Sequence, residues 1–285
     1  MFSERQRSRV SEGTACGRGG VAIMKIRILG NGGFYNEGLP YNAIAIDGHV
    51  LIETPPDILQ SLNHSDMRPS QIDTVFISHI HGDHCFGFPF FFFNWLYAGE
   101  ADSHYEKGSM LAIIGPAGLR EHLLALLRLA IPPEHQYIRD FSERAKLVEV
   151  DEGDIIAVKG NIWFSFMRTK HSLPTLSLIA GATAGPPPSP KRALKEALFA
   201  YSSDTAMFEG IHTLLESGAK LILCDTNGEK ESDVHMSPAQ LIAAARVHGL
   251  AGNSGRLLLG THMSRRIVSQ ENLRFAQDGE EFSVI

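Results

Sequence analysis

The sequence predicts an α/β protein built as a four-layer αββα sandwich, in which two β-sheets pack face to face between outer layers of helices. Two observations favour this class. Segments with strand character alternate with segments of helical length after two early hairpin strands. The 285 residues, of which 44% are hydrophobic, are also enough to bury one substantial core.

Local signals support the elements in chain order. Met24 begins an apolar run that suits a first strand, and Pro55 with Pro56 stops a later strand and begins a helix. Ser237 followed by Pro238 is typical of a helix start. We expect strands at 25–30, 43–47, 50–53, 74–78, 110–114, 146–150, 155–158, 162–168, 175–180, 197–202, 220–224 and 256–260, and helices at 56–63, 86–98, 117–129, 207–217 and 238–248.

The composition of the first 23 residues differs from that of the rest of the chain. Residues 1–23 are rich in Arg, Ser, Glu and Gly and have no apolar face, so we expect a disordered N-terminal extension. Residues 24–285 are expected to form a single domain. Within it, residues 181–195 read as a proline-rich insert, and their first ten residues are typical of a solvated linker with polyproline character.

The most informative stretch is the hexad at residues 79–84, His-Ile-His-Gly-Asp-His, which places four metal-binding side chains within six residues. It follows the apolar, strand-like run 74–77 and precedes the aromatic run 86–95, which has helical length. The histidines therefore fall in the turn after a strand, where Gly82 permits a tight bend. Imidazoles and carboxylates are ligands of zinc and similar divalent ions. A surface chelating patch is the alternative, which this setting disfavours.

Three further candidate ligands follow other apolar runs. His171 lies after residues 162–166, Asp204 closes a strand-like run that begins at Leu198, and His262 comes directly after residues 256–261. Each alone is weak evidence, because a single histidine after a strand is more often an ordinary hydrogen-bonded residue. Together with the hexad they would complete a site for two divalent ions, in which a carboxylate is the natural bridge.

With these motifs the sequence resembles the metallo-β-lactamase-fold hydrolases, over about residues 25–270. Residues 79–84 look like the HxHxDH signature of that family, and the three later candidates match its ligand motifs in order. The chain is most similar to the branch of ribonuclease Z and its short-chain phosphodiesterase relatives, because residues 114–119 resemble that branch's glycine–proline turn. Residues 51–60 look like its DTPPD turn, with Glu53 in place of the usual Asp, and we assign Glu53 no catalytic role. The resemblance implies the αββα sandwich.

The resemblance also implies a ligand set for two divalent metal ions. His79, His81 and His171 would hold one ion, Asp83, His84 and His262 the other, and Asp204 would bridge them. We expect zinc, with manganese or iron as alternatives, because His/Asp sites accept all three.

The same resemblance implies catalytic roles. A hydroxide activated by the ions would be the nucleophile, and Asp83 could also orient it. His235 falls where ribonuclease Z carries a His-Ser-Thr loop, so it is the candidate acid for the leaving alkoxide, with Asp225 as its support. A plain role near the cap of the following helix is the alternative for His235.

These features predict a binuclear metal-dependent hydrolase, and we expect a phosphodiesterase that acts on a small or cyclic phosphodiester or on RNA. A carboxylic-ester, lactone or aryl sulfate hydrolase, a tRNA 3′-end processing endoribonuclease and a non-catalytic metal-binding scaffold are the alternatives. A nucleic-acid partner is not favoured, because the formal net charge is −6 and residues 31–42 contain no Lys or Arg. Only residues 172–203 fill the gap in which ribonuclease Z carries its long tRNA-binding arm.

Location and assembly are less constrained. The sequence has no stretch that approaches the ~20 apolar residues needed to cross a bilayer, so we expect no membrane partner. The three cysteines form no paired framework and suit a reducing compartment, and we expect a cytoplasmic protein. A homodimer is compatible with the resemblance, although no pattern requires it.

Overall fold

The computed structural model describes residues 23–97, 108–228, 230, 232–250, 255–271 and 273–285. Its first sheet has the strand order β15-β1-β2-β3-β4-β5-β6. These strands are β1 (Met24–Gly30), β2 (Ala43–Ile46), β3 (Val50–Ile52), β4 (Thr74–Phe76), β5 (Leu111–Gly115), β6 (Ala145–Glu149) and β15 (Glu281–Val284). Neighbours from β15 to β3 are antiparallel, whereas those from β3 to β6 are parallel.

The second sheet has the order β13-β14-β12-β11-β10-β9-β8-β7. Its strands are β7 (Ile155–Val158), β8 (Ile162–Arg168), β9 (Leu176–Ala182), β10 (Phe199–Tyr201), β11 (Leu221–Asp225), β12 (Leu257–Thr261), β13 (Ser269–Gln270) and β14 (Leu273–Phe275). The strands from β7 to β10 are antiparallel, and those from β10 through β11 and β12 to β14 are parallel. Each sheet thus joins an antiparallel part to a parallel part.

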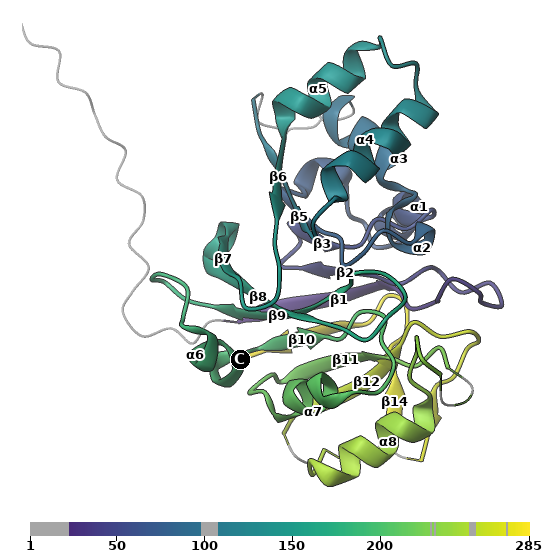
Figure 1. Ribbon diagram of the computed structural model, residues 1–285, viewed down its shortest axis with the longest axis vertical. Helices are drawn as coiled ribbons and strands as arrows, with labels where there is room; N and C mark the ends of the chain where they lie inside the picture. The colour runs from purple at the N-terminus through teal and green to yellow at the C-terminus, as the bar shows by residue number, and fades with distance from the viewer. Residues whose placement is uncertain (1–22, 98–107, 229, 231, 251–254, 272) are drawn as a thin grey trace, which may run out of the picture.

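Helices cover the outer face of each sheet (Figure 1). On the first sheet lie α1 (Ile58–His64), α2 (Gly82–Cys85), α3 (Phe88–Tyr97), α4 (Leu119–Ala130) and α5 (Gln136–Arg144), and on the second lie α6 (Pro190–Glu196), α7 (Glu209–Glu216) and α8 (Pro238–Val247). Three separate hydrophobic clusters fill the spaces between these layers, one between the sheets and one under each set of helices. The predicted four-layer αββα sandwich is therefore confirmed.

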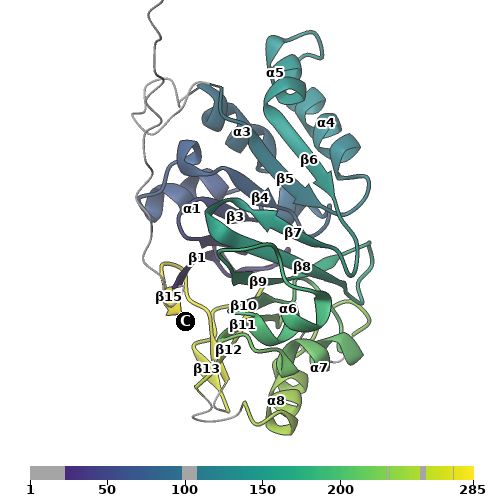
Figure 2. The ribbon, with the colours of Figure 1, turned by 90° about the vertical axis from the view of Figure 1, so that its left-hand side faces the viewer.

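The sequence patterns missed α5 and the three short strands after residue 268. Only Tyr137, Ile138 and Phe141 of α5 are buried, which is too short an apolar repeat to identify a helix. β15 depends on antiparallel pairing with β1, where Met24 lies opposite Val284 (Figure 2). Such pairing joins the two ends of the described chain, so no local pattern indicates it.

The proline-rich insert at residues 181–195 ends in a helix that the sequence patterns missed. This helix, α6, begins at Pro190, the last of the ten residues expected to form a linker, and Pro190 occupies its first turn, where the missing N–H costs no hydrogen bond. Ala193 is buried in the cluster beneath the helix, and Arg192 pairs with Glu196 one turn later at 2.9 Å. The expected extension at residues 1–23 lies outside the described residues, apart from the exposed Ile23.

Two other expectations concern the membrane and the thiols. Among the described residues, no helix combines the length and the apolar composition that a bilayer crossing requires. Cys85 and Cys224 are buried free thiols, and burial raises the pKa of the Cys85 thiol to about 12.

A close backbone contact fixes the helix that carries part of the histidine hexad. Thr54, just after β3, donates its amide to the carbonyl of His84 at 2.8 Å and accepts the amide of Gly87 at 2.9 Å. Gly87 lies between α2 and α3, and a Cβ atom at this position would stand 1.9 Å from the carbonyl oxygen of Pro55. The glycine therefore allows α2 to pack directly against the end of β3.

We expect Gly87→Ala to lower the free energy of unfolding by about 1–3 kcal/mol, because the added methyl group meets rigid backbone. Gly185→Ala is the matched control, since its Cβ would meet only Thr183 Oγ1 at 3.9 Å; it should stay within about 0.5 kcal/mol of the wild type. Urea denaturation followed by circular dichroism measures both. Equal denaturation midpoints for the two variants would contradict this account of the contact.

Candidate metal centre

The candidate site lies where strand ends of the two sheets meet. His79 follows β4, Asp204 follows β10, Asp225 ends β11 and His262 follows β12, all at the carboxyl ends of parallel strands. His171 comes from the loop between the antiparallel strands β8 and β9. The structure thus brings together residues that are up to 183 positions apart, because the carboxyl ends of parallel strands share one edge of a sheet.

Only the first part of the hexad at residues 79–84 is a loop, whereas we predicted a loop throughout. Helix α2 begins at Gly82, so Asp83 and His84 lie on a helical turn, whereas we had placed all four metal-binding residues in an irregular turn. His81 has extended backbone at the start of this helix. The hexad nevertheless divides into two pairs, because Asp83 and His84 join other donors than His79 and His81 do, although the ring centroids of His79 and His84 lie only 4.1 Å apart.

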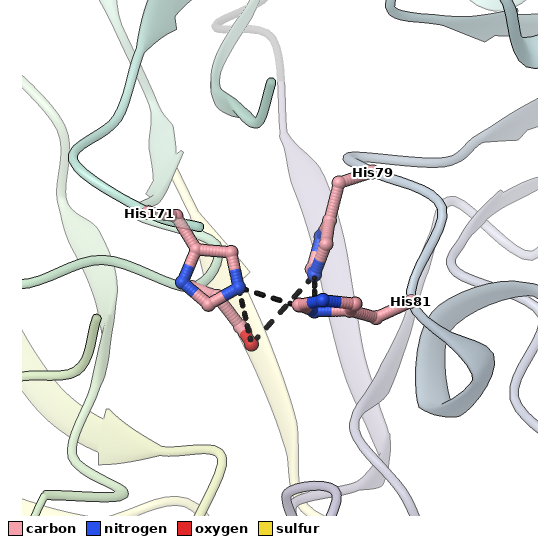
Figure 3. A group of neighbouring side chains, drawn as sticks. His79, His81 and His171 are labelled. Atoms are coloured by element: carbon pink, nitrogen blue, oxygen red, sulfur yellow. Dashed lines mark hydrogen bonds and ion pairs between the residues drawn. The ribbon is translucent and has the colours of Figure 1, made fainter. Parts of the chain in front are cut away.

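A first group of donors consists of three histidines and one carboxylate oxygen. His81 Nδ1 lies 3.0 Å from His79 Nε2 and 3.1 Å from His171 Nε2. Asp204 Oδ2 lies 3.8 Å from the Nε2 atoms of both His79 and His171. Figure 3 shows the three rings directed toward one another, with His171 opposite the other two.

A second group uses the other oxygen of the same aspartate. Asp204 Oδ1 lies 3.3 Å from His84 Nε2 and 3.4 Å from His262 Nε2. Asp83 Oδ2 lies 3.4 Å and 3.1 Å from the same two nitrogens. The second group therefore holds two imidazoles and two carboxylate oxygens, and Asp204 belongs to both groups through different atoms.

The donor spacing fits two divalent cations. Four donors at zinc–ligand distances of about 2.0–2.1 Å in a tetrahedron are roughly 3.3–3.4 Å apart. The donor pairs given above are 3.0–3.8 Å apart, and all donors of each group lie within 4.8 Å of one another. The buried atoms Asp83 Oδ1, Asp204 Oδ1 and His84 Nε2 have no hydrogen-bond partner among the described residues. Buried polar atoms without partners are costly, and cations would satisfy them.

The histidines of the first group are suited to bind a metal in neutral form. Burial, followed by the charge of His84, lowers the pKa of His79 well below its ordinary value. Burial likewise lowers the pKa of His81 and of His171. All three rings are therefore uncharged near neutral pH, and each can offer a nitrogen lone pair to a cation.

In the second group, the pKa values of the histidines are raised instead of lowered. Burial lowers the pKa of His84, but the facing Asp204 and the other carboxylates outweigh burial and raise this pKa above its ordinary value. The carboxylates likewise outweigh burial at His262 and raise its pKa to about 10. Burial also opposes ionisation of Asp83, but His84 and His262 hold the pKa of this carboxyl well below its usual range. Without metal, protons on the two histidines balance the carboxylates, and divalent cations would replace those protons.

Further residues orient the rings from behind. Glu53 is fully buried, its Oε1 lies 3.3 Å from His84 Nδ1, and its Oε2 accepts the amide of Ser78 at 3.2 Å. His171 Nδ1 donates to the carbonyl of Val234 at 2.9 Å, and Asp225 Oδ1 lies 3.5 Å from His262 Nδ1. Partners of this kind fix ring orientation at metal sites. The sequence argument gave Glu53 no role, and its position after a buried strand was the available signal.

Backbone strain is concentrated at the same site. Glu53, Ser203 and His262 have φ values of 66°, 55° and 57°, in the left-handed region that non-glycine residues seldom adopt. Each of them follows a strand that ends at the site. These turns redirect the chain at once, so that the side chains of Glu53 and His262 and the neighbouring Asp204 face the donor groups.

His235 forms a third side of the site. Its Nδ1 lies 2.7 Å from Asp225 Oδ2, and its ring centroid is 5.3 Å from that of His171 and 5.4 Å from that of His262. Burial lowers the pKa of His235, but the hydrogen bond and charge of Asp225 outweigh it and raise the pKa above the ordinary value. The side chain is 22% exposed, so this ring borders both donor groups and solvent.

Comparisons with curated proteins give partial matches to ribonuclease Z. The protein from Exiguobacterium sibiricum is 39% identical over 66 residues, which are 23% of this chain and 20% of that protein. The protein from Pediococcus pentosaceus is 29% identical over 109 residues, which are 38% of this chain and 31% of that protein. The chain therefore matches only a fifth to a third of the length of these relatives.

Solved structures are similar over most of the chain. Bacillus subtilis YhfI, a metallo-β-lactamase fold protein, has a TM-score of 0.69 at 15% identity and covers 92% of this chain and 100% of its own. The short form of human tRNase Z has a TM-score of 0.64 at 17% identity, covering 92% and 99%. At these identities the similarity shows the fold, which is the metallo-β-lactamase fold that the sequence motifs resembled.

A family model described as Anti-Pycsar protein Apyc1 matches residues 24–246. This range contains both pairs of the hexad, the His171 loop, Asp204 and the Asp225–His235 pair, whereas His262 lies beyond it. Since the match covers well over half of the sequence, the chain belongs to the Anti-Pycsar protein Apyc1 family.

Proposed function

We propose that this protein is a binuclear metal-dependent phosphodiesterase that acts on a small or cyclic phosphodiester. The observation that carries the proposal is the shared position of Asp204, which offers one carboxylate oxygen to each of two four-donor groups. Two cations held side by side suit a reaction in which both the attacking and the leaving oxygen need stabilisation.

In this proposal His79, His81 and His171 hold one ion, Asp83, His84 and His262 hold the second, and Asp204 lies between them. We expect zinc, because imidazole and carboxylate donors at this spacing suit it, with manganese or iron as alternatives. When bound, the ions supply positive charge for the phosphate oxygens and lower the pKa of a water molecule.

The remaining chemistry belongs to the chain. Asp83 keeps one buried oxygen without a hydrogen-bond partner, so it can accept a hydrogen bond from the attacking water and orient it. His235 is the proposed general acid for the leaving alkoxide. Its Nδ1 is engaged by Asp225, which leaves Nε2 to donate the proton, and the ring borders the ligands proposed for both ions.

Several observations favour phosphodiesters over other esters. An acid at His235 suits a leaving alkoxide, which phosphodiesters and carboxylic esters release and aryl sulfates do not, so it argues against the sulfate alternative. Relatives and structural neighbours include ribonuclease Z and a diphosphatase from the PhnP family, whose names refer to phosphorus–oxygen bonds. Between His171 and Asp204 the described chain forms only β9, the short α6 and β10, so it offers no long arm to grip tRNA.

The number of metal ions bound per chain should depend on which of the two donor groups is intact. Wild-type protein loaded with zinc should hold about two ions per chain, His171→Ala about one, and Asp204→Ala fewer than one, because Asp204 serves both sites. His64→Ala replaces an exposed histidine that belongs to neither donor group, so this control should keep two. Inductively coupled plasma mass spectrometry after desalting gives these counts. Well under two ions in the wild type would favour a metal-binding scaffold.

Chelation with EDTA should abolish hydrolysis of bis-p-nitrophenyl phosphate and of 3′,5′-cyclic ribonucleotides, and added zinc should restore it. A parallel screen with a lactone, an aryl sulfate and a precursor tRNA, each followed by product release, tests the alternatives. A clear preference for the lactone or the sulfate contradicts the phosphodiesterase, and efficient trimming of tRNA 3′ ends contradicts the small-substrate assignment.

His235→Ala should lower kcat about 10²–10⁴-fold for a diester that releases an alkoxide, since general acid catalysis contributes on that order. The loss should be much smaller for a p-nitrophenyl ester, because its leaving group needs no proton. Metal content should stay at the wild-type value, measured on the same preparation. Equal losses on both esters would mean that His235 acts on the structure of the site and donates no proton.

A further inference from the structure

A cavity of about 750 Å³ lies at the side of the sandwich where β6 and β7 are the last strands of their sheets. It borders the amino-terminal parts of the parallel strands β4, β5 and β6, whereas His79 follows the carboxyl end of β4. A separate cavity of about 470 Å³ borders the first donor group at His171. None of the residues that line the larger cavity is a proposed metal ligand, so the metal centre does not account for it.

The alternation of side chains along the strands explains why this cavity exists. One row across β4, β5 and β6 belongs to the hydrophobic cluster between the sheets, and it comprises Phe76, Ile114 and Val148. Two residues earlier on each strand, the same face carries Thr74, Ala112 and Lys146. Alanine is too small and lysine too polar to continue the cluster. The apolar packing therefore stops at this row, and a cavity takes its place.

The interior of the cavity is apolar. Ile114 and Val148 line it from the first sheet, and Ile156 and Val158 line it from β7 in the second. Val148, Ile156 and Val158 are only partly buried, although they pack against the cluster between the sheets. Because removing such surface from water lowers the free energy, these walls favour an apolar occupant.

The charges at the cavity favour an anion. Its charged lining residues are Asp73, Lys146 and Lys159. Lys159 Nζ lies 3.3 Å from Asp73 Oδ2, so these two charges balance each other. Lys146 is exposed and has no ion-pair partner among the residues that the structure describes. Two lysines and one aspartate leave one net positive charge, which suits one negative charge on the occupant.

We propose that this cavity binds a monoanionic amphiphile, a molecule with an aliphatic chain and a single carboxylate. The chain lies against Ile114, Val148 and Ile156, and the carboxylate pairs with Nζ of Lys146. The cavity volume falls within the range of roughly 300–1,000 Å³ that is usual for small-molecule sites. This second site goes beyond the proposed phosphodiesterase and does not depend on it.

Decanoate is the probe, and isothermal titration calorimetry on zinc-loaded protein measures its affinity. Wild-type protein should bind one decanoate per chain. Lys146→Gln should weaken this binding roughly tenfold, since a hydrogen bond between charged groups contributes on that order. The same variant should bind 1-decanol, which carries no charge, as the wild type does. Lys220→Gln is the matched control, because Lys220 is an exposed lysine outside the cavity, and it should change neither affinity.

A second variant tests the apolar part of the site. Ala112→Leu should weaken the binding of both decanoate and 1-decanol by roughly tenfold, the effect of about two displaced methylene groups. Ala130→Leu is the control, since Ala130 is the exposed last residue of α4 and does not line the cavity. Denaturation midpoints identify any variant that fails to fold. If Ala112→Leu does not fold, the comparison of decanoate with 1-decanol on Lys146→Gln decides alone.

Three results would overturn the proposal. The first is that wild-type protein shows no saturable binding of decanoate. The second is that Lys146→Gln leaves the affinity for decanoate unchanged or lowers the affinity for 1-decanol equally. The third is that folded Ala112→Leu binds decanoate as the wild type does, which would place the carboxylate elsewhere, such as on the metal ions. None of these readouts uses hydrolysis, so failure of the phosphodiesterase proposal and failure of this one are distinguishable.

Discussion

Burial of one carboxylate governs the structure of this site. Asp204 is 2% exposed, and burial raises the pKa of its carboxyl, but the charges of His262 and His84 outweigh burial and hold this pKa well below its usual range. A buried, unpaired carboxylate is among the costliest groups that a protein can contain. His84 and His262 supply the compensation as protonated rings in the chain alone, and divalent cations can supply more of it. The fold therefore buries carboxylates that need nearby positive charge, which protonated histidines or bound cations can supply.

The architecture makes this burial possible. Parallel strands in both sheets end at one edge, and the three hydrophobic clusters hold the sheets rigidly on either side of it. That rigidity can maintain left-handed backbone at Glu53, Ser203 and His262, which would relax in a less packed setting. The orienting partners come from the same edge, since Glu53 follows β3 and Asp225 ends β11. The positions of the candidate ligands consequently depend on the packing of the core.

The candidate metal centre differs in charge from the cavity beside it. The centre itself is charged, whereas the cavity beside His171 is lined by apolar surface, hydroxyls and one self-contained ion pair. The net charge of −6 and the short connection between His171 and Asp204 do not favour a long polyanion as the substrate of the proposed phosphodiesterase.

The sequence by itself determined the fold class and the candidate metal-binding residues, because hydrophobic periodicity and the spacing within residues 79–84 are local properties. Even the later candidates, such as Asp204, were visible as polar residues after apolar runs. Only the tertiary structure decided that Asp204 gives one oxygen to each donor group, that Glu53 stands behind His84, and that a neutral cavity adjoins His171. The formation of β15, α5 and α6 was likewise visible only in the tertiary structure. These features depend on strands and loops far apart in the chain, and their contacts arise from packing, which leaves no periodic signal in the sequence.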